Sequence, residues 1–270
     1  MKKFLDSFFR YFNIQITKTT NYNNLIFRLN ASEYNSEVTN RKNIEYQEAF
    51  EFIDELLMND LSHIVDVLPK SKSQLRQDLF VLNQLNYKKA GYFVEFGATN
   101  GIDLSNTYLL EKNFGWQGIL AEPSIGWHND LIKNRKCNID KNCVWIKSNE
   151  LLNFNEVINQ ELSTISLFNE SDRHSEKRKN GTSYKVNSIS LIDLLKKYNA
   201  PKEIDYLSID TEGSEYEILR NFDFEEYSFK IITVEHNYTP LREEIFQLLT
   251  SKGYKRKLQS FSKWDDWYIK

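Results

Sequence analysis

The chain has 270 residues, with 35 Lys+Arg against 38 Asp+Glu and a formal net charge of -3 at pH 7. This length suits one large domain with an extension. The balanced charge gives no support to nucleic-acid binding, which usually needs a basic excess or patch. Cys137 and Cys143 fit no zinc or redox spacing, and no apolar run approaches the ~20 residues that span a bilayer. We therefore expect a cytoplasmic protein with reduced thiols.

Residues 1–72 are expected to form a partly helical extension. In 1–12, five apolar residues share one face of an amphipathic helix: Phe4, Leu5, Phe8, Phe9 and Phe12. We expect this face to pack on the body of the protein or on a second copy in a homo-oligomer. Because Lys2, Lys3 and Arg10 lie beside it, contact with the inner face of the membrane is the alternative. Residues 13–42 are polar, and a helical pattern returns in 43–68.

Residues 73–270 are expected to form an α/β domain. Ser73 is a candidate N-cap for a helix over 74–85. Strands are expected at 91–97, 118–124, 143–149, 204–213 and 229–237, separated by helices at 104–115, 126–137, 188–199, 214–222 and 241–253. Apolar strands alternating with helices predict a mostly parallel, doubly wound sheet. The last residues, 254–270, predict a hairpin that adds an antiparallel edge. The pattern is weak over 150–187, where the highly charged stretch 169–183 predicts a mobile surface loop.

Acidic residues stand where several of these strands end. Ligands bind at the carboxyl ends of the strands in doubly wound sheets. The residues at these ends are Glu95, Glu122, Asp210 and Glu235, the last followed by His236. Their recurrence predicts one polar ligand site along this edge of the sheet.

The first strand is followed by the pattern E-x-G-x-x-x-G, formed by Glu95, Gly97 and Gly101. Glycines allow the backbone to come close to a bulky ligand. A dinucleotide site would show a third glycine in G-x-G-x-x-G. A carboxylate in this place suits a ligand with positive charge, such as the sulfonium and ammonium of S-adenosylmethionine. Glu122, at the end of the next strand, is placed to accept hydrogen bonds from ribose hydroxyls.

Several longer stretches resemble the FkbM family of S-adenosylmethionine-dependent methyltransferases. They are SQLRQDLFVL, GYFVEFGATNGIDLSNTYLLEKNFGWQGILAEPS and IDYLSIDTEGSEYEILRNFDF, followed by ITVEHN. The resemblance covers 73–270 and implies a Rossmann-like class I methyltransferase fold. It also implies O-methylation, often of sugars or polyketide-type hydroxyls. The cofactor residues implied by it are Gln74, Asp78, Glu95, Gly97, Ala98, Asn100, Gly101, Asn106 and Glu122.

Transfer of a methyl group to a sugar hydroxyl needs a base or a metal ion, because such a hydroxyl is a very weak acid. His236 is the first candidate for the base, since imidazole titrates near neutral pH. Asp210 and Glu235 are the alternative, as ligands of a divalent cation such as magnesium that lowers the pKa of the hydroxyl. We expect these three residues to converge on the acceptor.

The leading function is therefore O-methylation of a hydroxyl on a glycan or another small molecule. A nicotinamide-dependent oxidoreductase and a non-catalytic binding module are the alternatives. Loops in 1–72 and 165–187 are expected to shape the acceptor pocket. Asp210 and Glu212 precede a helix, and a helix-start role is the alternative for both. Trp116 and Trp127 are expected in the core, with the lining of a sugar site as the alternative. We expect Glu215 and Glu217 on a helix surface and assign no role to His63, His128 and His174.

Overall fold

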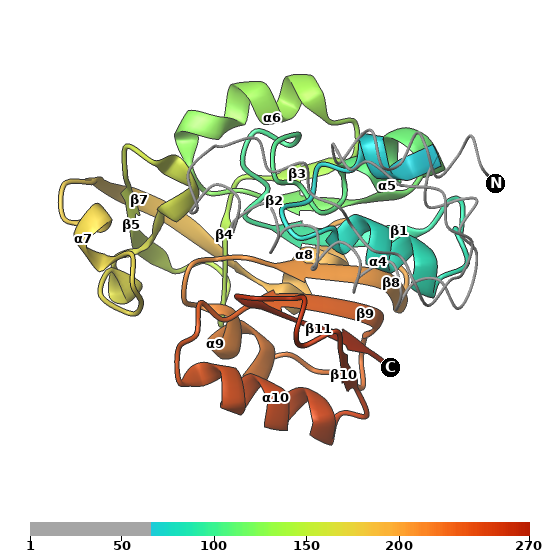
Figure 1. Cartoon of the computed structure of the whole chain (residues 1–270). Helices are drawn as coiled ribbons and strands as arrows, with labels where there is room; N and C mark the ends of the chain where they lie inside the picture. The colour runs from blue at the N-terminus through green and yellow to red at the C-terminus, as the bar shows by residue number, and fades with distance from the viewer. Residues whose placement is uncertain (1–65) are drawn as a thin grey trace, which may run out of the picture. The chain divides into compact units, whose positions relative to one another are not determined.

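The computed structural model describes residues 66–270 (Figure 1). The predictions for 1–12 and 13–42, and most of that for 43–68, lie outside these residues. Ser71–Lys270 forms one compact unit. Within 66–270, no helix is both long enough and apolar enough to cross a bilayer.

A seven-stranded sheet forms the centre of this unit, with the order β10-β11-β9-β8-β1-β2-β3. Its strands are β1 (Tyr92–Phe96), β2 (Gln117–Ala121), β3 (Asn138–Asp140), β8 (Glu203–Ile209), β9 (Ser228–Glu235), β10 (Lys255–Lys257) and β11 (Asp265–Ile269). The strands β3, β2, β1, β8 and β9 pair in parallel, whereas β11 pairs antiparallel with both β9 and β10. The predicted mostly parallel sheet is confirmed, and its antiparallel strand lies one place inside the edge.

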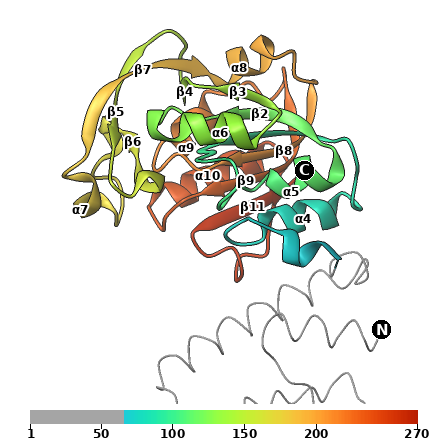
Figure 2. The same cartoon turned by 90° about the horizontal axis from the view of Figure 1, so that it is seen from above.

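Helices cover both faces of this sheet (Figures 1 and 2). On one face, α8 (Leu191–Lys197), α9 (Glu215–Arg220) and α10 (Leu241–Ser251) pack on an extended apolar cluster, through residues such as Leu194, Ile218 and Leu249. Further helices are α4 (Gln77–Gln84), α5 (Tyr108–Phe114) and α6 (His128–Asn134), with the short helices η1 (Leu68–Lys70) and η2 (Ile125–Trp127). Because both faces are covered, the central strands are mostly apolar, which is why the sequence shows apolar runs and not alternation of apolar and polar residues.

Ser190 caps α8, since its Oγ accepts a hydrogen bond from the Asp193 N–H at 3.1 Å. Ser73 is not the N-cap of α4, which begins later, at Gln77. Its Oγ accepts instead from the Asp78 N–H at 3.1 Å and so fixes the chain that leads into the helix.

The region predicted as a third strand and a charged loop folds differently. β3 is the third strand of the main sheet, and β4 (Cys143–Trp145) pairs with β7 (Thr182–Ser190) in a second sheet of order β4-β7-β5-β6. β5 (Leu151–Glu156), β6 (Thr164–Ile165) and α7 (Ser175–Arg178) complete this segment, with the short helices η3 (Gln160–Leu162) and η4 (Ser166–Phe168). A small apolar core, which includes Trp145, Phe154 and Val186, holds it together. The strands β5, β6 and β7 were not predicted, because this core needs only a few apolar residues among many charged ones. In the stretch 169–183, predicted as a loop, only α7 and the start of β7 are regular.

Gly97 brings the loop after β1 against the end of β8. Its φ is 74°, and a Cβ atom there would lie 2.0 Å from the backbone oxygen of Asp210. Gly115 has a similar φ of 68°, but nothing lies within 4 Å of its Cβ position. The glycine predicted to admit a ligand is therefore required for a contact within the protein.

We expect Gly97→Ala to destabilise the fold much more than Gly115→Ala. Both alanines adopt a left-handed conformation, which costs ~1–2 kcal/mol. Only the Gly97→Ala methyl group also clashes with backbone, and such overpacking adds ~1–3 kcal/mol. Urea unfolding monitored by circular dichroism measures both variants. Equal losses would show that the contact with Asp210 adjusts without cost.

Candidate active site

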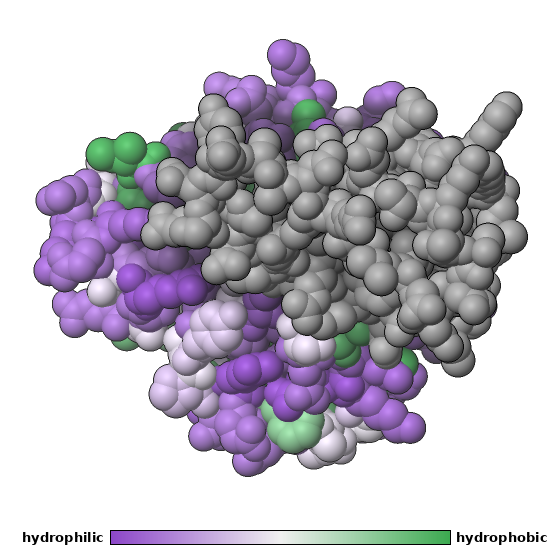
Figure 3. Space-filling model, viewed as in Figure 1, coloured by the Kyte–Doolittle hydropathy of each residue, from purple (hydrophilic) through white to green (hydrophobic). Residues whose placement is uncertain are grey.

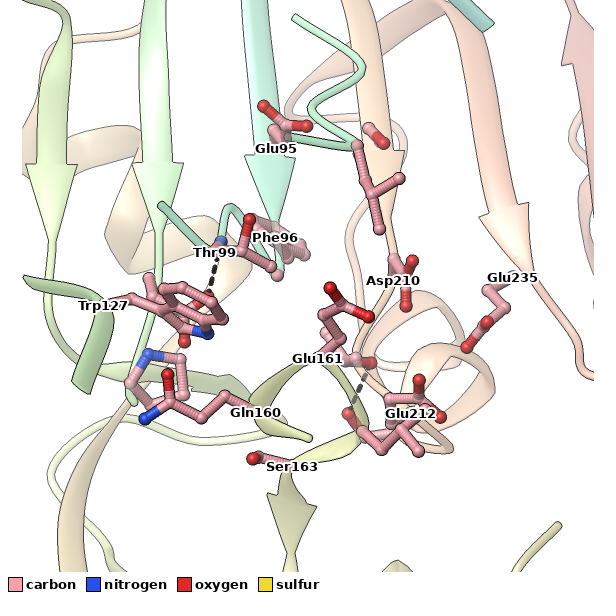
Figure 4. A pocket seen from close by; sticks show the side chains of 18 of the residues that line it. Glu95, Phe96, Thr99, Trp127, Gln160, Glu161, Ser163, Asp210, Glu212 and Glu235 are labelled. Atoms are coloured by element: carbon pink, nitrogen blue, oxygen red, sulfur yellow. Dashed lines mark hydrogen bonds between the residues drawn. The ribbon is translucent and has the colours of Figure 1, made fainter. Parts of the chain in front are cut away.

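A cavity of about 300 Å³ lies at the carboxyl ends of the central strands (Figure 4). The main sheet and its loops contribute Glu95, Gly97, Glu122, Asp210 and Glu235. The second sheet and the segment around it form the facing wall, including Gln160, Glu161 and Ser163. The cavity therefore lies where ligands bind in doubly wound sheets.

The cavity gathers some of the predicted site residues and not others. On its wall are Gln74, Glu95, Gly97, Asn106, Glu122, Asp210 and Glu235. Five predicted residues are not among the lining residues: Asp78, Ala98, Asn100, Gly101 and His236.

The residues outside the cavity have contacts that explain their types. Asp78 is fully buried and accepts a hydrogen bond from the Ser71 hydroxyl at 2.7 Å. Asn100 Oδ1 accepts from the N–H groups of Ile102 and Asp103, each at 2.9 Å, and so shapes the loop. A Cβ on Gly101 would lie 2.6 Å from the Arg135 side chain. These residues support the loop that borders the cavity.

Glu95 is buried and already bonded within the protein. Its Oε1 accepts from the Asn106 N–H at 2.7 Å, and its Oε2 accepts from the hydroxyls of Ser105 and Thr107. The Arg135 guanidinium lies 3.8 Å away. The acid that interrupts the apolar strand therefore holds the turn that leads into α5, and the geometry favours this role over direct pairing with a cationic ligand.

Asn106 presents the unused polar atom of this turn. Its amide nitrogen donates to Ser208 Oγ at 2.9 Å, whereas its buried Oδ1 has no partner within the described residues. A buried acceptor without a partner carries a desolvation cost. This oxygen is therefore ready to accept a hydrogen bond from a ligand in the cavity.

Glu122 ends the second strand and keeps part of its bonding capacity free. Its Oε2 accepts from the Thr99 N–H at 2.8 Å (Figure 4), and its Oε1 accepts from the Ser124 N–H at 2.9 Å. Each carboxylate oxygen can accept more than one hydrogen bond. Burial raises the pKa of Glu122 to about 7. The two backbone bonds fix the carboxylate so that its remaining lone pairs are available to a ligand.

Three carboxyl groups meet at the ends of β8 and β9 (Figure 4). One ligand oxygen from each of Asp210, Glu212 and Glu235 lies within 4.8 Å of the others. Burial raises the pKa of all three carboxyls, and the nearby negative charges raise it further. We call these residues the acidic trio. It is suited to take up a proton or to face a positive charge.

The short helix α7 holds the trio in place through Arg178, its last residue. This side chain is fully buried and donates to Glu212 Oε2 at 2.7 Å and to both oxygens of Asp172 at 2.9 Å. Glu212 has a φ of 59°, which is uncommon for a residue with a side chain. The ion pair thus fixes Glu212 on a turn that its backbone does not favour.

His236 does not converge with Asp210 and Glu235, contrary to the prediction. Adjacent residues of a strand point to opposite faces, so Glu235 lines the cavity and His236 does not. His236 Nδ1 accepts from the Tyr238 N–H at 3.0 Å, and Nε2 lies 3.8 Å from Asp266. Burial lowers the pKa of His236 to about 4. This placement favours a structural role.

Sequence reasoning missed or misplaced other residues of the site. Glu212, for which a helix start was one alternative, belongs to the trio, and Trp127 lines the cavity, which was the less favoured of its two predicted places. Glu215 was expected at the surface but is buried, where it accepts from the Thr211 and Gly213 N–H groups. Trp116 is in the core, as expected. The block of four acids, Asp210, Glu212, Glu215 and Glu217, was the available signal.

The strand order, with one antiparallel strand next to the edge, is that of the Rossmann-like fold of class I methyltransferases. A precorrin-6y C5,15-methyltransferase from Geobacter metallireducens aligns over 72% of this chain and 87% of its own, with 10% identity and a TM-score of 0.38. An FkbM methyltransferase from Methylobacillus flagellatus aligns over 77% of this chain and 60% of its own, with 10% identity and a TM-score of 0.41.

No curated protein matches this sequence significantly. The family model described as "Methyltransferase FkbM domain" matches residues 95–256, which include Glu95, Glu122 and the acidic trio. S-adenosylmethionine is the cofactor that this fold implies. The chain belongs to the FkbM methyltransferase family.

Proposed function

We propose that the protein transfers a methyl group from S-adenosylmethionine to a hydroxyl of a sugar, a glycan or a related small molecule. The acidic trio is the observation that carries this proposal, because it places carboxyls of raised pKa on the wall of the cavity. A carboxylate whose pKa is raised is a stronger base than an ordinary one and is better suited to remove the proton of a hydroxyl.

In this proposal, the residues whose polar atoms remain available in the cavity bind the cofactor. Glu122 accepts hydrogen bonds from the ribose hydroxyls, and Asn106 Oδ1 accepts from the ammonium of the methionine part. Gln74 and Gly97 border the same space. When bound, S-adenosylmethionine supplies a methyl group whose C–S bond breaks as a C–O bond forms, with the electron pair remaining on sulfur. The proton of the hydroxyl passes to a carboxylate of the protein.

Asp210 is the preferred proton acceptor in this proposal, with Glu235 beside it. The two carboxyls lie close enough to share a hydrogen bond, so that one of them stabilises the ionised form of the other. His236 is outside the cavity and is no longer preferred. The acidic trio replaces it as the group that receives the proton.

A divalent cation is the second possibility for the same residues. The trio offers three oxygen ligands, the kind that magnesium prefers. Glu212 Oε2 already accepts from Arg178 and from Asn237 at 3.3 Å, so Oε1 would serve as its ligand. In this version Asp210, Glu212 and Glu235 hold the ion, and the ion lowers the pKa of the acceptor hydroxyl.

Other expectations from the sequence stand as proposals. We propose a cytoplasmic location and no binding of nucleic acid. For residues 1–12 we propose contact within a homo-oligomer, or alternatively with a membrane. Membership of a methyltransferase family argues against the nicotinamide-dependent oxidoreductase. A non-catalytic binding module remains the rival, and it predicts that S-adenosylmethionine does not bind.

Calorimetry with S-adenosylhomocysteine tests the proposal first, and one site per chain is expected. A radiolabelled methyl group from S-adenosylmethionine is then followed into a panel of monosaccharides, sugar phosphates, uronic acids and phenols. The label should appear in an alkali-stable ether, because an ester would be hydrolysed. Absence of cofactor binding would favour the non-catalytic module, and tight NAD binding would revive the oxidoreductase.

Glu122→Gln should weaken S-adenosylhomocysteine binding by ~1–3 kcal/mol at pH 8.5, through loss of charged hydrogen bonds. Because both oxygens accept from backbone N–H groups, the new NH₂ group would also face a donor. Asp130→Asn, on the exposed start of α6, is the control and should bind normally.

The pH dependence of S-adenosylhomocysteine affinity in the wild type and in Glu122→Gln gives a second test of Glu122. Ligand hydroxyls favour ionised Glu122, so wild-type affinity should be full above the raised pKa of about 7. Below this pH, protons compete with the ligand and affinity falls, up to about ten-fold per pH unit. Glu122→Gln should lack this part of the fall. Identical pH profiles for the wild type and Glu122→Gln would remove Glu122 from the binding site.

A further inference from the structure

The chain around α7 brings basic side chains to the wall of the cavity. Arg173, His174 and Lys177 all line it, and Arg173 and Lys177 are exposed, which places them at its mouth. We call these residues the basic rim. The surface around α7 is mainly hydrophilic (Figure 3). Such a rim is either an ordinary solvated surface or a binding site for an anionic ligand.

The basic rim offers hydrogen-bond donors without paired acids. Arg173 Nε donates to His174 Nε2 at 3.2 Å, which leaves Nδ1 of that histidine as the protonated nitrogen. Burial, together with neighbouring positive charges, lowers the pKa of His174. Within residues 66–270, neither Arg173 nor Lys177 forms an ion pair with a carboxylate. Nearby Lys179 does, with Glu176 at 2.6 Å.

Arg173 is also held in position by its surroundings. Its guanidinium lies 5.7 Å from the ring centre of Tyr238 and 5.8 Å from that of Trp264. Nη2 lies 3.5 Å from Asn237 Oδ1, at the limit of a hydrogen bond. An arginine oriented by two aromatic rings loses less freedom on binding a ligand than a fully solvated one. This observation separates the rim from an ordinary charged surface.

The acids near the rim do not neutralise it. Asp172 is engaged by Arg178 through two bonds of 2.9 Å, and Glu212 is bonded to the same arginine. Glu161 lines the cavity but makes no ion pair within the described part of the chain. Asp103 and Glu161 are exposed acids that also line the cavity. The basic rim and the acidic trio still differ in charge, so a ligand that spans from one to the other should present opposite polarity at its two ends.

We propose that the acceptor carries an anionic group, a phosphate or a carboxylate, which the basic rim binds while its hydroxyl faces the acidic trio. This inference rests on the proposed methyl transfer and adds the class of acceptor. Guanidinium and ammonium groups bind both anions through charge-assisted hydrogen bonds. Arg173 and Lys177 are thus specificity-determining residues, distinct from the group that receives the proton.

The test compares glucose, glucose 1-phosphate and glucuronate as probes. Their binding to the full chain is measured by calorimetry in the presence of saturating S-adenosylhomocysteine. The variants are Arg173→Ala/Lys177→Ala and, as the matched control from the same segment, Lys179→Ala. S-adenosylhomocysteine affinity is measured separately for each protein.

At least one anionic probe should bind about ten-fold or more tightly than glucose, a difference that one or two charged hydrogen bonds supply. The double variant should lose most of this preference and Lys179→Ala should keep it. The tighter of the two anionic probes identifies phosphate or carboxylate as the preferred group.

Two results would overturn the inference. One is that no anionic probe binds more tightly than glucose to wild-type protein. The other is that the double variant loses S-adenosylhomocysteine affinity, which would assign the rim to the carboxylate of the cofactor. Normal S-adenosylhomocysteine binding without any anion preference would reject the inference and leave the proposed function intact.

Discussion

Asp210→Asn should lower the rate of methyl transfer by ~10²–10⁴-fold, the range for loss of a general base. Burial and the nearby acids raise the pKa of Asp210, so its carboxylate is basic enough to accept a proton from the reacting hydroxyl. An amide cannot accept that proton. The rate is measured with the best acceptor of the panel.

Glu217→Gln is the matched control for this substitution. Glu217 lies on α9 near the trio in sequence but pairs with Arg220 at 2.9 Å and does not line the cavity. Its rate should stay within about two-fold of wild type, since a surface ion pair contributes little. S-adenosylhomocysteine affinity should be preserved in both variants, because this product lacks the sulfonium charge. A normal rate in Asp210→Asn would place the base elsewhere.

Activity with and without EDTA separates the two roles of the trio. If Asp210 acts directly, chelation leaves the rate unchanged and only the substitution lowers it. If Asp210, Glu212 and Glu235 hold an ion, EDTA abolishes activity and magnesium restores it. The rate of Glu212→Gln separates the two roles again. It should fall strongly if Glu212 is a ligand of the ion, and less than in Asp210→Asn if Asp210 is the proton acceptor.

The sequence identified the strand ends because each acid directly follows an apolar run. Such a run predicts a buried strand, and the residue after it falls at the carboxyl edge. Glu122, Asp210 and Glu235 all line the cavity for this reason. The same reasoning failed for His236, because it follows Glu235 directly and so points to the other face.

Long-range contacts account for most of what the sequence did not predict. The sequence predicts Glu95 as a ligand-binding residue, but in the structure it binds the turn at Ser105–Thr107. The sequence predicts that Gly97 lets a ligand approach the backbone, but the group that comes close to it is the backbone of Asp210. The second sheet was missed because short strands with few apolar residues give a weak pattern. Arg178 stands in a charged stretch, and nothing local distinguishes it from the exposed lysines beside it.

Arg178→Met should be the most destabilising single substitution proposed for this chain. Removal of one member of a buried ion pair costs ~3–5 kcal/mol, because the remaining charge stays buried without compensation. Here two carboxylates, Asp172 and Glu212, would lose their partner. Methionine fills a similar volume, so the loss reports charge and hydrogen bonds more than packing. Urea unfolding of the whole chain measures the effect.

Arg220→Met supplies the control, because Arg220 forms an ion pair with Glu217 at 2.9 Å but its side chain is 52% exposed. Such surface pairs contribute ~0–1 kcal/mol. The triple variant Arg178→Met/Asp172→Asn/Glu212→Gln then tests the cause. Since it removes both unpaired charges, it should regain a large part of the lost stability. If the triple variant is no more stable than Arg178→Met, the bonds from Arg178 to the Leu162 and Phe168 carbonyls, at 2.8 and 3.3 Å, account for the loss, and the ion pairs do not.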